Sequence, residues 1–217
     1  MTAALAAAPA DASADAVTDM LDFAYELAGG PLERDYAAPL RAQLAALLPW
    51  LAAEPHAGIH PLQRTTASAG RLLLGARSRL VLRVPRARLA DCAALQGHQL
   101  GLPAPLQLGA LHVRELLPYR TLYSALVLMG EADEGAFLGA VRATIDAWDM
   151  RCQVIVGKAG TRHERDSADA GLHGFSVMLH GLTPEQSLQV QERGLGRARL
   201  LGCGVFIPHK SVDPVGA

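Results

Sequence analysis

The stretch Thr183–Lys210, TPEQSLQVQERGLGRARLLGCGVFIPHK, decides how the C-terminal part of the chain folds. It opens with a helix signal, because Thr183 is a preferred N-cap residue and Pro184 suits the first helical position. Gln186, three residues after the cap, completes a capping box. Gly194 supplies the positive φ that commonly ends a helix. The pattern predicts a helix from Pro184 to the residue before Gly194.

A glycine-rich loop and a short apolar strand follow this helix. The strand is Val205–Ile207, and Pro208 closes it. The loop, residues 194–204, combines four glycines with two arginines: Gly194, Gly196, Gly202, Gly204, Arg197 and Arg199. Backbone amides and arginines at a helix–loop junction favour phosphate binding. We therefore expect this loop to approach an anionic ligand.

Length and composition exclude several classes of protein. The 217 residues, half of them hydrophobic, suffice for one large or two small domains. No apolar run approaches the ~20 residues that span a bilayer, so no membrane partner is expected. The three cysteines, Cys92, Cys152 and Cys203, show neither metal spacing nor a disulfide framework. We expect a cytoplasmic protein without metal or small-molecule cofactor. We also expect a disordered Ala-rich tail at 1–16 and a flexible tail at 211–217.

Charge is distributed unevenly along the chain, although the net charge is only −1. Residues 1–60 hold eight acidic groups and two arginines, whereas residues 61–100 hold seven arginines and one aspartate. Arginine makes up 18 of the 20 basic residues, and its planar head suits bidentate phosphate recognition. A GC-rich genome explains the arginine-to-lysine ratio equally well, but it does not explain the segregation of charge.

The first half of the chain has the pattern β-α-β-β-α-β. Period-2 alternation predicts a strand over 21–27, and helical spacing from Leu40 to Leu51 predicts a helix capped by Asp35. The other elements expected here are strands at 59–65, 99–102 and 106–113, a hairpin from 72–74 through Gly75–Ser78 into 80–84, and a helix over 86–95 with Leu89, Cys92 and Leu95 inward.

The second half repeats this order. Its expected elements are strands at 122–129, 152–156, 175–179 and 205–207, helices at 134–148 and 184–193, and a polar loop with Lys158, Arg162, His163 and Arg165. The order is that of the ferredoxin-like split βαβ unit. We predict an α+β fold of two tandem ferredoxin-like, RRM-like units, at 17–117 and 118–210, the second carrying the glycine-rich loop.

Two nucleotide-binding interpretations fail. The segment Gly194-Leu195-Gly196 superficially matches a dinucleotide-binding loop, but that loop needs a strand before it and a helix after it. The chain also contains no GK[ST] of a phosphate-binding P-loop.

The C-terminal stretch resembles a known family. GLTPEQSLQVQERGLGRARLLGCGVFIP is similar to the C-terminal signature of CRISPR-associated endoribonucleases that cut repeat RNA, the Cas "six" family of the RAMP superfamily. The resemblance is greatest to the compact variant of myxobacterial-type CRISPR systems. The shared pattern is a helix carrying S-L-x-x-Q, then G-x-G-x-x-x-x-x-G-x-G and an apolar strand. Residues 47–50, 58–61, 78–85 and the segment after Leu122 extend it to about 21–208.

The resemblance implies two ferredoxin-like units and an RNA-cleavage reaction. In that reaction the 2′-hydroxyl upstream of the scissile phosphate attacks it without a metal, leaving a 2′,3′-cyclic phosphate and a 5′-hydroxyl. The implied partners are the CRISPR repeat RNA hairpin, which stays bound as the mature guide, and other subunits of a CRISPR effector complex.

Our candidate catalytic residues are His60, as acid or base, together with Tyr36 and Arg34. The family often places a histidine at the start of the first helix, in a segment resembling D-H-x-Y-x-L-Y; here Tyr36 of Asp35–Arg41 stands in its place. Three alternatives remain open. His60 or His56 replaces it, with Tyr36 and Arg34 positioning the phosphate; the site is built differently, with tyrosine, lysine or arginine in the role; or the protein binds RNA without cutting it. For His60, a strand-start histidine satisfied by the backbone is the competing interpretation.

Residues expected to bind RNA are basic or belong to the glycine loop: Arg79, Arg83, Arg162, His163, Arg165, Arg193, Gly194, Gly196, Arg197, Arg199, Gly202 and Gly204. Phosphate contacts and shape dominate hairpin recognition. Three functions compete: an RNA-processing enzyme, a non-catalytic repeat-RNA-binding subunit, and a regulatory or dimerisation module with this fold.

Overall fold

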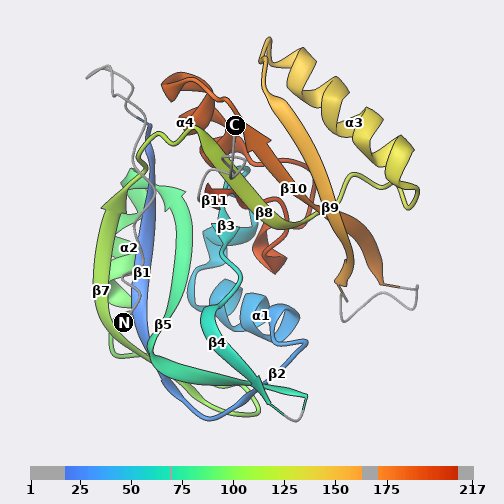
Figure 1. Ribbon diagram of the computed structural model, residues 1–217. Helices are drawn as coiled ribbons and strands as arrows, with labels where there is room; N and C mark the ends of the chain where they lie inside the picture. Colours follow the sequence, from blue (N-terminus) through green and yellow to red (C-terminus); the bar gives the residue numbers. More distant parts are fainter. Residues whose placement is uncertain (1–17, 69, 163–170, 210–217) are drawn as a thin grey trace, which may run out of the picture.

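The computed structural model describes residues 18–68, 70–162 and 171–209. Two antiparallel sheets lie side by side, one from each half of the chain (Figure 1). The predicted tails at 1–16 and 211–217, together with His163 and Arg165, lie outside the described residues.

The first sheet carries the order β2-β5-β1-β7-β6, and β3 and β4 also pair with β5. Its strands are β1 (Met20–Gly29), β2 (Leu32–Glu33), β3 (Gly58–Ile59), β4 (Gln63–Ser68), β5 (Arg71–Pro85), β6 (Gln99–Leu100) and β7 (Leu106–Glu115). The helices of this half are α1 (Ala37–Leu47), η1 (Pro49–Ala52), η2 (Arg86–Arg88) and α2 (Leu89–Ala94). The path β7-β1-β5-β4 is the strand order of a ferredoxin-like unit.

Alternation along β1 and β5 decides which face of the first sheet is buried. Phe23, Tyr25, Leu80 and Leu82 are completely buried in the core that α1 and α2 cover. The Tyr25 hydroxyl donates to the carbonyl of Cys92 at 2.7 Å, which ties β1 to α2. The opposite face carries the charged side chains of β1 and β5, and it is this face that builds the site.

The second sheet has the order β11-β8-β10-β9 and repeats the ferredoxin-like arrangement. Its elements are β8 (Thr121–Val127), α3 (Glu134–Ala147), β9 (Gln153–Arg162), β10 (Leu172–His180), α4 (Pro184–Arg193), η3 (Arg199–Leu201) and β11 (Ile207–Pro208). Phe137, Val141 and Ile145 of α3 are buried against this sheet, as their spacing predicted.

Helix α4 begins and ends where its sequence signals predicted. Thr183 Oγ1 accepts from the Gln186 amide, and the Gln186 side chain accepts from the Thr183 amide at 3.1 Å. Gly194 ends the helix with φ +65°. The capping box and the glycine stop are therefore both confirmed.

The predicted hairpin over 72–84 is wrong, because β5 runs unbroken from Arg71 to Pro85. Gly75–Ser78 bulges out instead: Gln63 pairs with Arg79, yet Thr65 pairs with Leu74. The Gly75 amide donates to Ser78 Oγ at 3.0 Å, which satisfies a polar group inside the bulge. Glycine beside polar residues marks both turns and bulges, so the local sequence did not separate them.

Proline residues explain why two other elements end earlier than predicted. The helix expected to reach Leu51 ends at Leu47, because Pro49 cannot donate a helical hydrogen bond and starts the separate turn η1. The strand expected at 59–65 divides into β3 and β4 on either side of Pro61, which likewise has no amide hydrogen.

Smaller differences concern single residues. Asp35 does not cap α1, whose N-cap is Tyr36 without a side-chain bond. Leu89 is 46 % exposed rather than inward, whereas Cys92 and Leu95 are buried as expected. Lys158 and Arg162, expected in a loop, lie on β9.

The two halves meet where α1 packs beneath the glycine-rich loop. Ala37 and Ala38 at the start of α1 are buried together with Leu201 and Cys203 of the loop and with β8 and its continuation. Figure 1 shows α1 next to the red segment that precedes β11. The start of α1 and the loop after α4 are thus neighbours in space.

Candidate functional site

Arg83 joins the two halves from the charged face of the first sheet. Its Nε and Nη2 donate to the two carboxylate oxygens of Asp22 on β1, at 2.7 and 2.9 Å. Its Nη1 donates to the carbonyls of Gln191 and Phe206 in the second half, at 3.0 and 2.8 Å. Arg83 was expected to bind RNA. The second half of the chain covers its side chain instead, which is only 1 % exposed.

His60 lies beside this ion pair. Its backbone amide donates to the Val81 carbonyl at 2.9 Å, which fixes it against β5 although it follows β3. Its Nε2 is 3.3 Å from Asp22 Oδ1, slightly long for a hydrogen bond. Nε2 is buried and has no hydrogen-bond partner within the part of the chain that the structure describes. His60 therefore forms a loose dyad with Asp22.

Burial and charge set the protonation of this dyad. Burial raises the pKa of the Asp22 carboxyl, but His60 and Arg83 lower it more, so the pKa lies well below its ordinary value. Burial lowers the pKa of His60 and outweighs the Asp22 carboxylate, which raises it. The imidazole is therefore neutral at pH 7. With His60 neutral, the bidentate Arg83 is what keeps Asp22 ionised.

A pocket of about 290 Å³ opens over the dyad, and we call it the arginine pocket. Its lining comes from both halves of the chain: Asp22, His60, Pro61, Arg77, Arg79, Val81, Arg114, Ile207 and Pro208. Arg79 is partly held by Glu26, whose Oε1 is 3.0 Å from Arg79 Nη2. Arg77 and Arg114 are exposed at the surface. A neutral imidazole beneath three guanidinium groups provides a proton acceptor and positive charge for an anion.

Backbone hydrogen bonds within the loop and to residues 126 and 128 hold the glycine-rich loop in place. The amides of Leu195, Arg197 and Gly204 donate to the carbonyls of Gly204, Leu128 and Leu126, respectively, at 3.2, 3.1 and 2.7 Å. We expected loop amides to bind phosphate, and these three are instead used inside the protein. A Cβ at Gly196 would lie 2.3 Å from the Leu128 carbonyl oxygen, so this glycine permits close backbone packing.

Arg199 is buried in the same junction rather than exposed to an RNA. Its Nη1 donates to the Glu192 carbonyl at 2.7 Å, and the side chain is 7 % exposed. Its Nε and Nη2 have no partner among the residues described. Burial, and then the neighbouring Arg83, lowers the pKa of Arg199 to about 10, so it keeps its charge at pH 7.

Tyr36 lies against the segment that carries His60. Its hydroxyl accepts from the Leu62 amide at 2.8 Å, and Tyr36 and His60 line one small cavity. Burial raises the pKa of Tyr36 more than the Leu62 amide and the Arg162 charge lower it, so the phenol is protonated. The structure thus brings Tyr36 and His60 together, whereas Arg34 is exposed and lines neither this cavity nor the arginine pocket.

The remaining predicted residues are spread over the second half. Arg193 is exposed and lies over the Trp148 ring at 5.6 Å, and Arg197 and Gly196 are exposed. Gly194, Gly202 and Gly204 are buried. Arg162 ends β9, and its Nε is buried without an acceptor within the described ranges.

Sequence reasoning missed Asp22, Arg77 and Arg114. Asp22 and Arg114 are register partners on β1 and β7, 92 positions apart in sequence, and only the sheet brings them together. The alternation along β1 placed Asp22 on the polar face, which was the available signal.

Residues 18–68, 70–162 and 171–209 contain neither a cluster of metal ligands nor a membrane-spanning helix. No group of three or more His, Cys, Asp or Glu is arranged to hold a metal ion there. None of the helices in these ranges is long and apolar enough to cross a membrane.

Known proteins resemble this chain over most of its length. The family model described as Cas6 Crispr matches residues 21–211. The CRISPR-associated endonuclease Cas6 of Myxococcus xanthus (strain DK1622) is 33 % identical over 190 residues, which are 87 % of this chain and 81 % of the relative.

Solved structures share the fold at low sequence identity. A structure described as CRISPR associated protein Cas6 has a TM-score of 0.61 at 10 % identity, covering 88 % of this chain and 100 % of that one. A Cas6-related protein from Pyrococcus furiosus gives 0.59 at 13 % identity, covering 87 % and 98 %. Thermus thermophilus Cse3, bound to an RNA representing a pre-cleavage complex, gives 0.52 at 13 % identity, covering 88 % and 98 %. The predicted tandem ferredoxin-like fold is confirmed.

Proposed function

The chain belongs to the Cas6 family of CRISPR-associated proteins, and we propose that it processes CRISPR precursor RNA by binding the repeat hairpin and cleaving it. The relative from Myxococcus xanthus is an endonuclease, which supports an endoribonuclease here. One observation carries the proposal: the neutral His60 and the ionised Asp22 share the wall of a pocket that three arginines line.

In the proposed reaction His60 acts as the general base. With Nε2 held toward Asp22, Nδ1 is the nitrogen left to take the proton of the 2′-hydroxyl. The 2′-oxygen then forms a bond to phosphorus, and the bond from phosphorus to the 5′-oxygen breaks. The products are a 2′,3′-cyclic phosphate and a 5′-hydroxyl, the latter protonated by water or by the imidazolium. Asp22 stabilises the imidazolium that forms in between.

The arginines supply the charge that this reaction needs at phosphorus. Negative charge accumulates on the non-bridging oxygens of the phosphorane, and Arg77, Arg79 and Arg114 lie around the pocket to offset it. Because these groups replace a cation, we propose a reaction that requires no metal. The first step needs only a neutral base and positive charge.

We propose further that the protein keeps hold of the processed RNA and passes it to other subunits of a CRISPR effector complex. Exposed arginines outside the pocket, such as Arg193 and Arg197, support retention, because phosphate contacts do not depend on an intact scissile bond. A burst of one product per protein, followed by slow turnover, is the expected time course.

The alternative function is binding of the repeat without cleavage. Tyr36, at the position of the family's histidine, has its hydroxyl committed to the Leu62 amide, and His60 is only 5 % exposed. On this alternative, the buried dyad is purely structural.

Incubation of the protein with its own repeat RNA in excess EDTA distinguishes the two functions. We expect a fragment that ends in a 2′,3′-cyclic phosphate. Once the site is mapped, a repeat with a 2′-deoxy sugar at the nucleotide upstream of the scissile phosphate should bind equally well and remain intact. Tight binding with the unmodified repeat uncut would establish the non-catalytic function. Cleavage that appears only when a divalent cation is restored would contradict the metal-independent step.

A further inference from the structure

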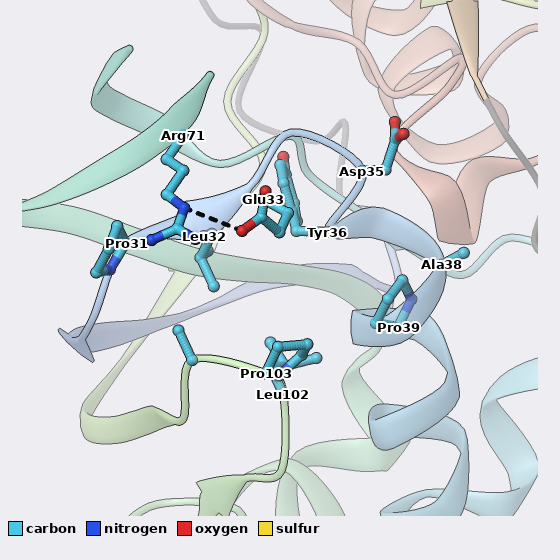
Figure 2. A pocket seen from close by; sticks show the side chains of 11 residues that line it. Pro31, Leu32, Glu33, Asp35, Tyr36, Ala38, Pro39, Arg71, Leu102 and Pro103 are labelled. Carbon is cyan, nitrogen blue, oxygen red and sulfur yellow. Dashed lines mark ion pairs between the residues drawn. The ribbon is translucent and has the colours of Figure 1, made fainter. Parts of the chain in front are cut away.

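A second pocket, of about 510 Å³, lies at the start of α1 and is separate from the arginine pocket. Its floor is buried and mostly apolar, formed by Leu32, Tyr36, Ala38 and Leu102. Prolines 31, 39 and 103 stand around it. Figure 2 shows the Glu33–Arg71 pair on one side and the segment of Leu102 and Pro103 across from it. An apolar pocket of this size with a few polar groups is the usual form of a small-molecule site.

The polar groups at the mouth of this pocket form a defined edge. Glu33 and Arg71 are register partners on β2 and β5, and Glu33 Oε1 is 3.0 Å from Arg71 Nε. Their side chains are 60 % and 56 % exposed, so both also face solvent. Asp35 adds a second carboxylate to the lining. Two carboxylates and one guanidinium repel a phosphate but suit a neutral group with several N–H donors.

We propose that this pocket, which we call the proline pocket, binds an unpaired guanine base of the RNA. Glu33 Oε1 lies 3.0 Å from Arg71 Nε, so a carboxylate with two acceptor oxygens sits beside a guanidinium with further N–H donors. Guanine presents the complementary order on its Watson–Crick edge: the 2-amino group and N1–H donate, and O6 accepts. Cytosine, adenine and uracil each place an acceptor or a C–H where the second donor is needed. The proline rings and Leu102 provide the apolar surfaces between which an extruded base stacks.

The position of the pocket connects it to the RNA. Tyr36 belongs both to its floor and to the small cavity that His60 lines. A base held here would flank the RNA strand near the proposed cleavage site, in an unpaired segment, where sequence-specific RNA recognition occurs. The inference rests on the proposed function, because it presumes that the protein binds RNA.

Short single-stranded RNAs test the inference directly. The probes are fluorescein-labelled heptamers of uridine with the central nucleotide replaced by G, inosine, A or C, and their dissociation constants are measured by anisotropy in EDTA. We expect the G probe to bind about tenfold more tightly than the U, A and C probes, in line with the discrimination of one bidentate contact. Inosine lacks the 2-amino group and should lose most of this preference.

Two variants connect the preference to the pocket. Glu33→Gln replaces one acceptor by a donor and should abolish the preference for G, so that the variant binds the G probe no more tightly than the U heptamer. Ala104→Trp fills the pocket and should do the same. The matched control is Glu115→Gln, because Glu115 is an exposed carboxylate 2.7 Å from Arg86 elsewhere on the same sheet. This control should keep the preference, and thermal unfolding checks that all three variants fold.

The outcomes are distinguishable. Equal affinities for all five heptamers, or a preference for G that survives Glu33→Gln, overturn the inference while cleavage of the repeat still supports the proposed function. Binding of free GMP without any preference among the heptamers would assign the pocket to a nucleotide ligand and also overturn it. A preference for G that survives Ala104→Trp would overturn the inference as well, because the base would then bind outside this pocket. If no RNA binds at all, the proposed function and the inference fall together.

Discussion

Arg83 connects the two halves of the molecule through hydrogen bonds to both of them. It neutralises Asp22 from one side and satisfies two backbone carbonyls of the other half. A buried ion pair adds little stability relative to an apolar pair, but loss of one partner leaves a buried charge alone. Arg83 therefore matters most through what its removal would expose.

Replacement of Arg83 by methionine should lower the free energy of unfolding by about 3 kcal/mol, since Asp22 and two carbonyls would lose their donor. Chemical denaturation measures this change. The control is Arg86→Met, because Arg86 and Glu115 form an ion pair in which both side chains are about half exposed. This control should cost less than about 1 kcal/mol. Equal losses in the two variants would show that Arg83 does not hold the junction.

His60 should make stability depend on pH between about 5 and 7. The pKa of its imidazole is lowered from 6.5 in the folded protein, so below pH 6.5 the unfolded chain binds a proton that the folded chain refuses. The free energy of unfolding therefore decreases as the pH is lowered, by up to about 1.4 kcal/mol per pH unit for one proton. Asp22 does not contribute in this window, because its folded pKa lies below its ordinary 3.8 and its contribution is lost only under more acidic conditions.

The variant His60→Gln should therefore lose less stability than the parent chain between pH 7 and pH 5, as followed by denaturant titration at each pH. A steeper loss in the variant would mean that His60 is protonated in the folded protein.

At the scale of elements, the glycine-rich loop is a packed structure. It folds back so closely that the loop and the end of β8 share backbone hydrogen bonds, which needs glycine at several positions. The stretch was expected to approach an anion, and its glycines instead allow the backbone to approach other backbone. Its exposed part carries Arg197.

Gly204→Ala should destabilise the protein more than Gly130→Ala by roughly 1–3 kcal/mol. Both glycines have positive φ, +64° and +97°, so both variants carry the left-handed penalty. Only at Gly204 would the new Cβ meet backbone, 1.9 Å from the Leu195 carbonyl oxygen, whereas nothing lies within 4 Å of a Cβ at Gly130. Similar unfolding free energies for the two variants would mean that the loop backbone can shift, at little energetic cost, to make room for the new Cβ.

Elements with strong local signals could be predicted from the sequence. Elements whose shape depends on pairing with a distant strand could not. The capping box at Thr183 and the apolar face of α3 are local, and both are confirmed. The bulge at Gly75–Ser78 depends on β4 as a pairing partner, so the same residues were interpreted as a turn. Pro49 and Pro61 indicated breaks in the predicted helix and strand. The helical spacing and the alternation around them were nevertheless interpreted as continuous elements.

At the scale of the whole molecule, the first unit supplies most of the candidate site, and the second unit completes the wall of its pocket with Ile207 and Pro208. The tandem fold could be predicted, since the order of elements repeats and each unit buries its own core. The arginine pocket could not, because its lining gathers residues from positions 22 to 208. His60 was predicted from its place in the chain, but its partner Asp22 depends on the register of the first sheet.

RNA affinity should weaken steeply with salt, because each phosphate contact releases counterions. The variant Arg114→Gln, which removes one charge from the arginine pocket, should reduce the slope of log affinity against log salt by about one contact. Arg86→Gln is the matched control, since Arg86 is an exposed arginine outside this pocket. Filter binding of the uncleavable 2′-deoxy repeat at several salt concentrations measures both slopes, and equal slopes would remove Arg114 from the RNA-binding surface.

Single-turnover cleavage of the repeat RNA by His60→Gln tests the central claim most directly. Glutamine keeps the size and polarity of the side chain but accepts no proton, so the rate should fall by about 10²–10⁴-fold. Affinity for the uncleavable repeat should stay within about threefold of that of the parent chain. A variant that binds the repeat equally well and cleaves it at the parent rate would show that His60 is not the base.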